Sequence, residues 1–226
     1  MFAVIFIVEP KPGRFEEYLA LAKSLKPEIE SIDGFIDNER FRSTRRVGQV
    51  LSLSTWRDEK ALVRWRTRSI HHTAQEKGRC EILDDYHLRV GEVTADTAVP
   101  SDRQPAQQRF DETEVGAAKL VTISELSTTK GDKPFSDTIA ADLGLPRSGT
   151  HGIVDREAFE SIYNPGKLLF LVSWRNGVAA EAWRPKRAAA GTLRDRQVRI
   201  IRDYGMRDRR EAPQYYPPVR APREDP

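Results

Sequence analysis

The sequence predicts an α+β fold made of two ferredoxin-like (βαββαβ) repeats whose sheets pack against each other. Two observations support this prediction. The apolar pattern switches between the periods of strands and of helices, and the second half of the chain repeats the first. A sheet covered by helices on one face leaves its other face apolar, and that face needs a partner. A second copy of the same unit on the same chain can provide it.

The duplication rests on pairs of similar residues at one offset of 118 positions (174 − 56). A period of this length is far too long for a solenoid, so we interpret it as two copies of one small domain. A constant offset also predicts no net insertion between the copies. The pairs include Trp56 and Trp174, Trp65 and Trp183, Asp85-Tyr86 and Asp203-Tyr204, and Gly34 to Asp37 with Gly152 to Asp155.

Composition narrows the class of protein. With 226 residues, 38% hydrophobic and 31% charged, the chain can form two soluble domains with modest cores. The net charge is +3, and acidic residues lie among the arginines, which favours a solvated surface over a nucleic-acid partner. The single cysteine, Cys80, excludes an intrachain disulfide and fits a cytoplasmic protein. The apolar start at 2–8 is too short for a membrane segment, so no membrane partner is expected.

The elements expected in the first copy begin with a buried strand at 2–8. Residues 14–31 then show the spacing of an amphipathic helix, which Pro27 bends or shortens. Residues 35–43 and 50–56 form a strand hairpin, with Phe35 and Phe41 expected on one face.

Asp58 is the expected N-cap of the second helical stretch, in which Ala61, Leu62 and Trp65 form the apolar stripe. Gly78 is expected to end that stretch, and residues 82–93 form the last strand.

The second copy shows the same order in degraded form. Strands are expected at 117–126, 151–157, 167–174 and 198–207, with a weak helix around Phe135, Ile139 and Leu143 and another at 177–190 that Pro185 interrupts. The predicted domains are therefore 1–94 and 117–208, joined by a linker at 95–116. Residues 209–226 form a proline-rich tail, expected to be extended and to lie on the other copy.

The stretch from Trp56 to Val90 carries a recognisable motif: W-R-D-E-x-A, then W-R, then H-x-x-A-Q, and finally D-Y-x-L-R-V. It resembles the antibiotic biosynthesis monooxygenase (ABM) family, and within it the branch of haem-degrading or quinol monooxygenase-like members. The resemblance covers 2–93 well and 117–207 weakly. It implies that two ferredoxin-like domains pair into an α+β barrel, here as an intramolecular version of the dimeric barrel. It further implies a cleft between sheet and helices and a reaction that often needs no metal or flavin.

The resemblance also implies site residues. His71 and Trp65 are the catalytic candidates. His71 is expected to act as base, hydrogen-bond donor or haem ligand, with a helix-surface or capping histidine as the alternative. Trp65 either forms a cleft wall or packs in the core. The substrate-binding candidates are Arg79, Gln75, Tyr86, Phe6 and Arg89. Surface ion pairs for the arginines and core packing for Tyr86 remain the alternatives.

Two departures from the family pattern bear on haem and on the second copy. The first-strand asparagine and the helix histidine of haem-degrading members fall on Phe6 and Gln75, which argues against haem ligation in that style. At the 118 offset, His71 and His72 become Ala189 and Ala190, and Arg79 becomes Gln197. The second copy is therefore interpreted as a structural partner, with His151 and Tyr163 as its only titratable candidates.

The function expected from these features is a cofactor-independent monooxygenase that oxidises a small aromatic, phenolic or quinol-type compound with O2. Two alternatives stay open: a non-catalytic barrel that binds a small ligand, and a haem-binding or haem-degrading protein. No cofactor and no metal site are expected, with haem kept as an alternative ligand or substrate. Further homodimerisation is left open as well.

Overall fold

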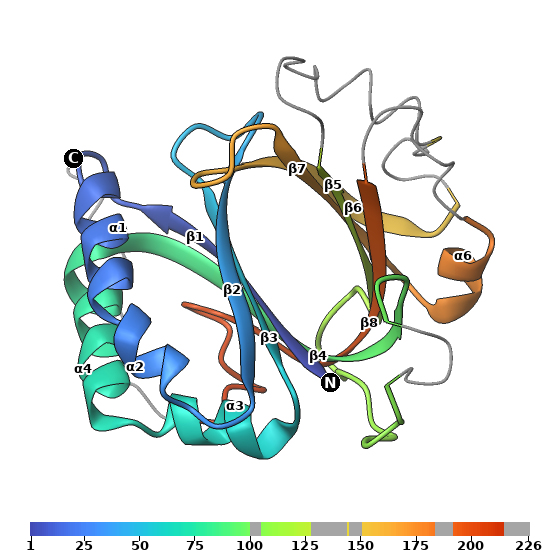
Figure 1. The fold of residues 1–226 in the computed structure, drawn as a ribbon, viewed down its shortest axis with the longest axis horizontal. Coiled ribbons are helices and arrows are strands. Elements are labelled where there is room, and N and C mark those ends of the chain that lie inside the picture. Colours follow the sequence, from blue (N-terminus) through green and yellow to red (C-terminus); the bar gives the residue numbers. More distant parts are fainter. Residues whose placement is uncertain (100–104, 128–143, 145–150, 184–191, 215–226) are drawn as a thin grey trace, which may run out of the picture.

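The protein, a computed structural model, is described over residues 1–99, 105–127, 144, 151–183 and 192–214. Within these residues, eight strands close into one barrel in the order β1-β3-β2-β6-β7-β5-β8-β4. Helices cover the outside of the half that the first repeat forms (Figure 1). The predicted fold class is confirmed: each repeat contributes four antiparallel strands, and the two sheets enclose a common interior.

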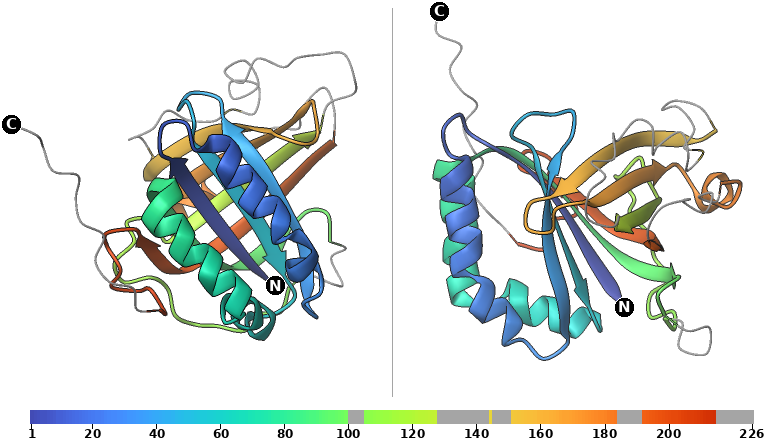
Figure 2. Two further views of the ribbon diagram at one scale, coloured as in Figure 1. Left: turned by 90° about the vertical axis from the view of Figure 1, so that its left-hand side faces the viewer. Right: turned by 45° about the horizontal axis from the view of Figure 1, so that its top comes forward.

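The first repeat consists of β1 (Phe2–Pro10), α1 (Phe15–Ser24), α2 (Lys26–Glu30), β2 (Phe35–Ser43), β3 (Val50–Trp56), α3 (Glu59–Arg66), α4 (Ser69–Lys77), a π-helical turn η1 (Gly78–Ile82) and β4 (Leu83–Asp96). The second repeat consists of β5 (Leu120–Ser127), β6 (Ile153–Ser161), β7 (Lys167–Trp174), α6 (Gly177–Glu181) and β8 (Thr192–Gly205). In the first repeat, α1 and α4 lie side by side over the outer face of the sheet (Figure 2).

Strand periodicity divides the side chains of β1 between two environments. Ala3 and Ile5 belong to the barrel interior, where Leu51, Val121 and other residues of both repeats pack together. Phe2 and Val8 point the other way, into the apolar clusters beneath the helices. The sheet of the first repeat is therefore buried on both faces along β1, as the apolar run at 2–8 predicts.

One local expectation is wrong for an identifiable reason. Phe35 and Phe41 do not share a face, because the β2–β3 register shifts between Phe35 and Asp37. Phe41 lies in the barrel interior, whereas the Phe35 ring contacts that of Trp56 on the helix side, with centroids 5.3 Å apart. The α-helix does end before Gly78, as predicted, but the chain continues through a π-helical turn to Ile82 before β4 begins.

Other local signals act as predicted. The first helix divides at Leu25, so that Pro27 falls in the first turn of α2, where its missing N–H is tolerated. Asp58 caps α3 by accepting a hydrogen bond of 2.8 Å from the N–H of Ala61. Its counterpart Asn176 caps α6 in the same way.

The offset of 118 holds for three strands of each repeat but not for the fourth. Phe2 pairs with Trp56 just as Leu120 pairs with Trp174, which preserves the offset. In the last strand, however, Val198 takes the place of Gly91: Gly91 pairs with Ala3, and Val198 pairs with the equivalent Val121. The offset there is 107 (198 − 91), so the second repeat is 11 residues shorter (118 − 107) between its third and fourth strands.

This register corrects the expectation of no net insertion. The shortened stretch corresponds to the part of the first repeat that holds α4 and η1. Gln197 is consequently a strand residue of β8 and not an equivalent of Arg79, and Asp203-Tyr204 is not the structural equivalent of Asp85-Tyr86.

Contacts between the repeats come in matched pairs, as they do across a two-fold axis in a homodimer. The strands meet edge to edge at β2–β6 and at β4–β8. Around these edges, three side-chain contacts made by one repeat have a counterpart made by the other. The pairs are Ser43–Glu157 (2.8 Å) with Ser161–Glu39 (2.6 Å), Arg194–Asp96 (2.6 Å) with His87–Asp203 (2.6 Å), and Arg196–Thr55 (3.0 Å) with Arg89–Ser173 (2.7 Å).

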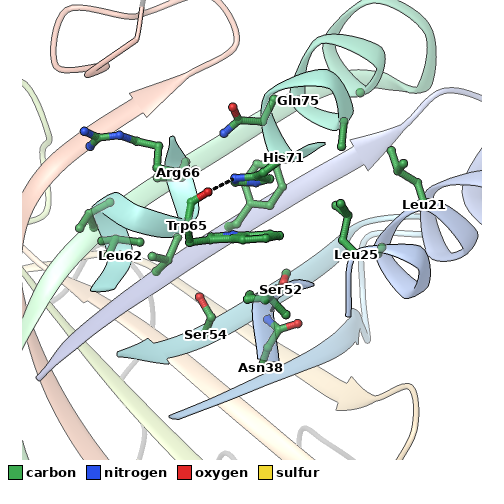
Figure 3. A pocket seen from close by; sticks show the side chains of 18 of the residues that line it. Leu21, Leu25, Asn38, Ser52, Ser54, Leu62, Trp65, Arg66, His71 and Gln75 are labelled. Atoms are coloured by element: carbon green, nitrogen blue, oxygen red, sulfur yellow. Dashed lines mark hydrogen bonds between the residues drawn. The ribbon is translucent and has the colours of Figure 1, made fainter. Parts of the chain in front are cut away.

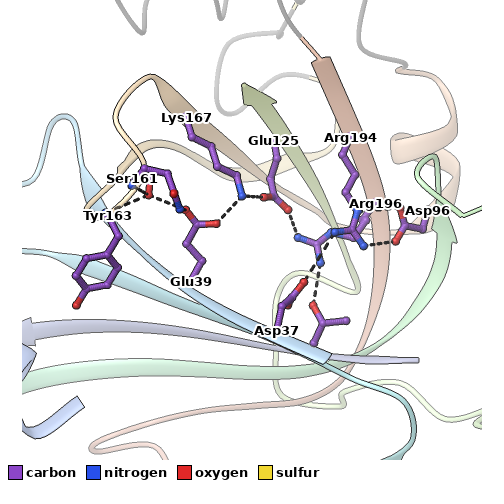
Figure 4. A network of polar contacts seen from close by, with 11 residues as sticks. Asp37, Glu39, Asp96, Glu125, Ser161, Tyr163, Lys167, Arg194 and Arg196 are labelled. Atoms are coloured by element: carbon purple, nitrogen blue, oxygen red, sulfur yellow. Dashed lines mark hydrogen bonds and ion pairs between the residues drawn. The ribbon is translucent and has the colours of Figure 1, made fainter. Parts of the chain in front are cut away.

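One end of the barrel interior, which we call the Arg196 mouth, holds a continuous polar network (Figure 4). Arg196 is 1% exposed, and its guanidinium donates to the Glu125 carboxylate. Lys167 lies 2.5 Å from Glu39 and 2.6 Å from Glu125, so it joins the two repeats. All of these charges have a partner of opposite sign, which is what makes charges tolerable inside a protein.

The linker and the start of the tail are held against the barrel by Glu211. Its carboxylate accepts hydrogen bonds from Thr113 and from the N–H groups of Glu114, Val115 and Asp203. Burial alone would raise the pKa of Glu211, but these hydrogen bonds lower it. Farther along, the Gln214 amide donates to the carbonyl of Arg66, so residues 209–214 do lie on the first repeat.

Several expectations fall outside the described residues: the helix around Phe135, Ile139 and Leu143, the end of the helix at 177–190, and the tail beyond Gln214. The domain boundaries stay predictions. Among the helices that the structure describes, none is both long and apolar enough to cross a membrane.

We predict that Arg196→Met lowers the free energy of unfolding by about 3 kcal/mol, because it leaves Glu125 buried with Lys167 as its only cation. Urea unfolding followed by circular dichroism measures the loss. Arg210→Met removes an exposed partner of Asp208 and serves as the matched control, with little change expected. A loss no larger than that of the control would mean that the network does not stabilise the barrel.

Candidate active site

A cleft of about 200 Å³ lies between the outer face of the first sheet and the helices above it. We call it the helix-side cleft. Its lining is mostly apolar, with a few polar groups at defined places, as is typical of small-molecule sites. The apolar lining residues are Val4, Phe6, Leu21, Ala22, Leu25, Ile29, Leu62, Val63, Trp65, Ala74, Ile82, Leu83, Leu88 and Val90.

An aromatic pair dominates one wall of the cleft (Figure 3). The rings of Trp65 and His71 are stacked, with centroids 4.1 Å apart and planes 16° from parallel. Trp65 ends α3 and His71 lies in the first turn of α4, so the short connection between the helices brings the two rings together. The resemblance named both residues, and the structure brings them into one site.

The hydrogen bonding of His71 defines its tautomer. Nδ1 lies 3.1 Å from the carbonyl oxygen of Trp65, which can only accept a hydrogen bond. Nδ1 therefore carries the proton of the neutral ring, and Nε2 carries a lone pair. Within the described part of the chain, Nε2 has no hydrogen-bond partner. Burial lowers the pKa of His71 to about 4, against the opposing effect of the Trp65 carbonyl, so the ring is neutral at pH 7.

Polar side chains of the sheet face this pair from the opposite wall. The Asn38 amide of β2 donates to the Ser52 hydroxyl and to the Leu53 carbonyl, both at 3.0 Å. These two bonds fix the orientation of the amide, and its carbonyl oxygen remains as an acceptor for a ligand. Haem-degrading members of the family carry an amide on the first strand, where this chain has Phe6; in this chain an amide lines the cleft from β2.

The second repeat completes the cleft. Tyr204 and Arg202 of β8 and Pro213 of the tail all belong to its lining. Burial raises the pKa of Tyr204 to about 12, so its hydroxyl stays protonated. The Arg209 guanidinium lies 5.6 Å from the centre of the Tyr204 ring and fixes the wall further. One repeat alone therefore does not form this site.

Three arginines give the cleft a positive character. Arg40, Arg66 and Arg202 line it, and none of them forms an ion pair with a carboxylate of the described residues. The Nε atoms of Arg40 and Arg66 are buried without a hydrogen-bond partner. The one acidic lining residue, Glu59, is held by Arg109 at 2.7 Å. An anionic group on a ligand would meet uncompensated positive charge here.

The structure brings together four of the seven predicted site residues: His71, Trp65, Gln75 and Phe6 line the helix-side cleft. Arg79 and Tyr86 lie beside it and bind each other, with 2.6 Å between Nη1 and the phenol oxygen. They belong to a buried polar contact near the cleft and not to its lining.

Arg89 is the exception among the predicted residues. It pairs with Ile5 in the β1–β4 ladder, and therefore faces the barrel interior with Ile5, away from the cleft. The sequence holds the signal for this correction, because Leu88 and Val90 share the helix-side face and strand alternation sends Arg89 to the other. In the second repeat, His151 and Tyr163 are absent from the lining of the cleft, and Ala189 and Ala190 lie outside the described residues.

Asn38, Arg66 and Arg202 are among the polar lining residues that sequence reasoning missed. Strand alternation could have identified Asn38, because it lies three residues before Phe41 in β2 and therefore on the opposite face of the sheet. Arg66 belongs to the repeated Trp-Arg motif, which by itself indicates the duplication and not a place in the cleft. Nothing in the sequence marks Arg202, because only the meeting of the two repeats brings it to the cleft.

The fold and the cleft define a class: an α+β barrel of two fused repeats, with a mostly apolar cleft over one sheet. The sequence model of the antibiotic biosynthesis monooxygenase family matches residues 1–77. The protein "Jasmonate monooxygenase ABM" of Pyricularia oryzae is 46% identical over 223 residues, which cover 97% of this chain and 100% of that protein. The chain belongs to the antibiotic biosynthesis monooxygenase family, and it is a monooxygenase.

Two solved structures are similar to the chain at low sequence identity, and the first of them shares the fold. The crystal structure of aldoxime dehydratase superposes with a TM-score of 0.54 and 12% identity, over 88% of this chain and 80% of that one. A putative monooxygenase from Lactobacillus acidophilus NCFM gives a TM-score of 0.40 and 10% identity, over 89% and 94% of the two chains. The described residues contain no cluster of three or more His, Cys, Asp or Glu side chains arranged to hold a metal ion.

The lowered pKa of His71 predicts a stability difference that depends on pH. Between the ordinary histidine value and about 4, the unfolded chain binds a proton at His71 and the folded chain does not, so stability falls as the pH falls. From pH 7 to pH 4.5, His71 should remove about 2–3 kcal/mol of stability. His71→Gln should abolish that part of the loss in urea unfolding. His72→Gln, which alters the exposed neighbour, should keep it, and equal losses in wild type and His71→Gln would contradict the assignment.

Proposed function

We propose that this monooxygenase oxidises a small cyclic compound bearing an anionic group, in the helix-side cleft and without a metal or flavin. The observation that supports the proposal is the stacked Trp65–His71 pair, whose free Nε2 faces an apolar cleft lined by arginines without acidic partners. The substrate ring packs on the indole, its reactive O–H or C–H group meets Nε2, and its anionic group meets an arginine.

The chemistry suits substrates that form an electron-rich anion, such as phenols, quinols and enolisable cyclic ketones. Full transfer of a proton from an ordinary phenol, with a pKa of about 10, to an imidazole with a pKa of about 4 is unfavourable by about 8 kcal/mol. His71 therefore acts as a hydrogen-bond acceptor that orients and polarises the substrate. The proton passes to the peroxide as O2 adds to the ring carbon.

The reaction then needs no external reductant. Oxygen adds to a carbon that carries hydrogen and gives a hydroperoxide. The hydroperoxide loses water as the O–O bond and the remaining C–H bond break. The net change converts CH2 and O2 into C=O and H2O, or, for a phenol, an aromatic C–H and O2 into a quinone and H2O. The four electrons that reduce O2 come from the substrate and leave one oxygen atom in the product.

Two substrate types fit this scheme. A phenolic or quinol-type ring follows from the resemblance of the motif. A jasmonate, which is a cyclopentanone carboxylic acid, follows from the printed name of the relative that is 46% identical. The three arginines of the cleft favour whichever member of either class carries a carboxylate.

A haem-degrading function and a non-catalytic binding function are less well supported. The cleft volume of about 200 Å³ is below the ~300–1,000 Å³ of sites for drug-sized ligands, and therefore favours a molecule smaller than haem. A haem titration tests this directly: a stoichiometric Soret shift that His71→Gln abolishes would favour haem and would overturn the proposal.

We expect turnover by purified protein without added metal, flavin or nicotinamide, with one O2 consumed for each product molecule. Under ¹⁸O2, mass spectrometry should find one labelled atom in the product and the other in water. His71→Phe should lower kcat/KM by about 10²-fold or more, because it keeps a ring against Trp65 but removes the acceptor at Nε2. A requirement for a reductant, or unchanged turnover in His71→Phe, would contradict the mechanism.

Recognition of the anionic group by Arg66 predicts a selective effect on KM. For jasmonate, or for 2,5-dihydroxybenzoate as a quinol that carries a carboxylate, Arg66→Gln should raise KM by about tenfold or more and change kcat little. The methyl ester of the same compound should show no such change. Arg68→Gln alters a neighbouring exposed arginine that pairs with Glu28, and it should leave both substrates unaffected. Equal effects on acid and ester would contradict the role of Arg66.

A further inference from the structure

A second cavity, of about 310 Å³, opens at the end of the barrel opposite the Arg196 mouth. We call this end the Arg89 mouth. Its lining comes from both repeats: Ile7, Gln49 and Arg89 from the first, and Ser173 and Asp155 from the second. It lies on the other face of the first sheet from the helix-side cleft, and nothing in the proposed reaction uses it.

Arg89 is a buried cation without a counterion. It is 4% exposed, and its one hydrogen bond runs from Nη1 to the Ser173 hydroxyl at 2.7 Å. Its Nε is buried without a partner, and no carboxylate of the described residues lies within 4.0 Å of its guanidinium. Burial lowers the pKa of Arg89, and the more distant Asp203 and Asp155 oppose this effect only in part. An unpaired charge in such a place destabilises a folded protein strongly.

Comparison with the Arg196 mouth identifies the counterion that Arg89 lacks. Arg196 occupies the place of Arg89 in the second repeat: Arg89 pairs with Ile5, and Arg196 pairs with the equivalent Ile123. Each arginine donates to the hydroxyl of an equivalent residue, Ser173 for Arg89 and Thr55 for Arg196.

The two mouths differ in the diagonal neighbour of the arginine. Next to Arg196, this position holds Glu125, whose carboxylate binds the guanidinium (Figure 4). Next to Arg89, the equivalent position holds Ile7, which cannot pair with it. Diagonal neighbours on one face of a sheet are within reach of long side chains, so a carboxylate at this place would contact Arg89.

The other charged groups around the cavity are already engaged. Asp203 binds His87 at 2.6 Å, Glu9 accepts from the Gln49 amide at 2.8 Å, and Arg46 lies near Asp155 and Glu157. Asp85 accepts from the N–H of Tyr86. The Gln49 carbonyl oxygen, by contrast, is buried without a donor. The surrounding acids disfavour a dianion such as phosphate, and the free acceptor favours a ligand that also carries a donor.

We infer that the Arg89 mouth binds a small monocarboxylate with a hydroxyl or amino group, in a site separate from the catalytic cleft. The carboxylate takes the place next to Arg89 that Glu125 takes next to Arg196, with the Ser173 hydroxyl beside it. The donor group of the ligand meets the Gln49 carbonyl oxygen. The site is formed by both repeats, so its occupant ties β1 and β4 to β7 across the barrel interior.

The test compares glycolate, glycine, acetate and inorganic phosphate at constant ionic strength, with sodium chloride as the reference. The readouts are ¹H–¹⁵N chemical shifts of Ile7, Gln49 and Ser173 and the melting temperature. Glycolate or glycine should shift these signals saturably and raise the melting temperature, acetate should bind more weakly, and phosphate should not bind. In Arg89→Gln the affinity should fall by about tenfold or more.

Substitution of Ile7 gives an independent arm that does not depend on the folding of Arg89→Gln. Ile7→Glu supplies the counterion from the chain itself, so it should abolish carboxylate binding and raise the melting temperature of the unliganded protein. Ile7→Gln has the same shape without the charge, and should retain binding. Arg66→Gln, in the helix-side cleft, should also retain it, so the outcome is distinguishable from that of the proposed reaction. Binding that survives Ile7→Glu, tighter binding of phosphate, or no saturable shift with any carboxylate would overturn the proposal.

Discussion

The structure depends on one constraint: each of two sheets has an apolar face that only the other sheet can cover. The interior cluster draws on both repeats, with Ile5, Phe41 and Leu51 from one and Ile123, Phe159 and Leu169 from the other. Edge pairing at β2–β6 and β4–β8 then removes every open sheet edge of the described strands, which is how a barrel avoids the aggregation that free edges promote. Because both sheets belong to one chain, the partner is always present at high effective concentration.

The same closure forms the helix-side cleft from both repeats. Arg202, Tyr204 and Pro213 reach the helix-side cleft only because β8 lies beside β4, so the second repeat serves the site of the first. The second repeat itself is 11 residues shorter where the first carries α4 and η1 (118 − 107). His71 and Gln75 lie between α3 and β4, the stretch in which the offset changes, so a constant offset cannot assign their counterparts.

Much of the fold could be predicted from the sequence, because strand and helix periods are local properties. The strands at 50–56 and 167–174 and the cap at Asp58 depend on adjacent residues alone. The register of paired strands, and the face of the sheet on which a side chain lies, depend on distant partners, and there the predictions failed. A bulge in β2 places Phe35 and Phe41 on opposite faces. In β8, Val198 occupies the position that the constant offset assigns to the residue 11 positions later. For the site, the motif led to His71 and Trp65, whose stacking follows from a short connection between helices. The positive character of the cleft could not be predicted, since Arg40, Arg66 and Arg202 come from three separate elements.

The contrast between Ile7 and Glu125 has an evolutionary consequence. In a homodimer, one codon encodes both ends of the barrel, so a mutation that removes an acidic residue beside one arginine removes it beside the other too. Fusion of the two genes ends that coupling. One end can then keep its internal ion pair as a permanent structural element, as Glu125 does with Arg196, while the other end drifts toward a new specificity. Tandem chains of this kind can therefore carry different residues at the two ends of the barrel, which a homodimer of identical subunits cannot.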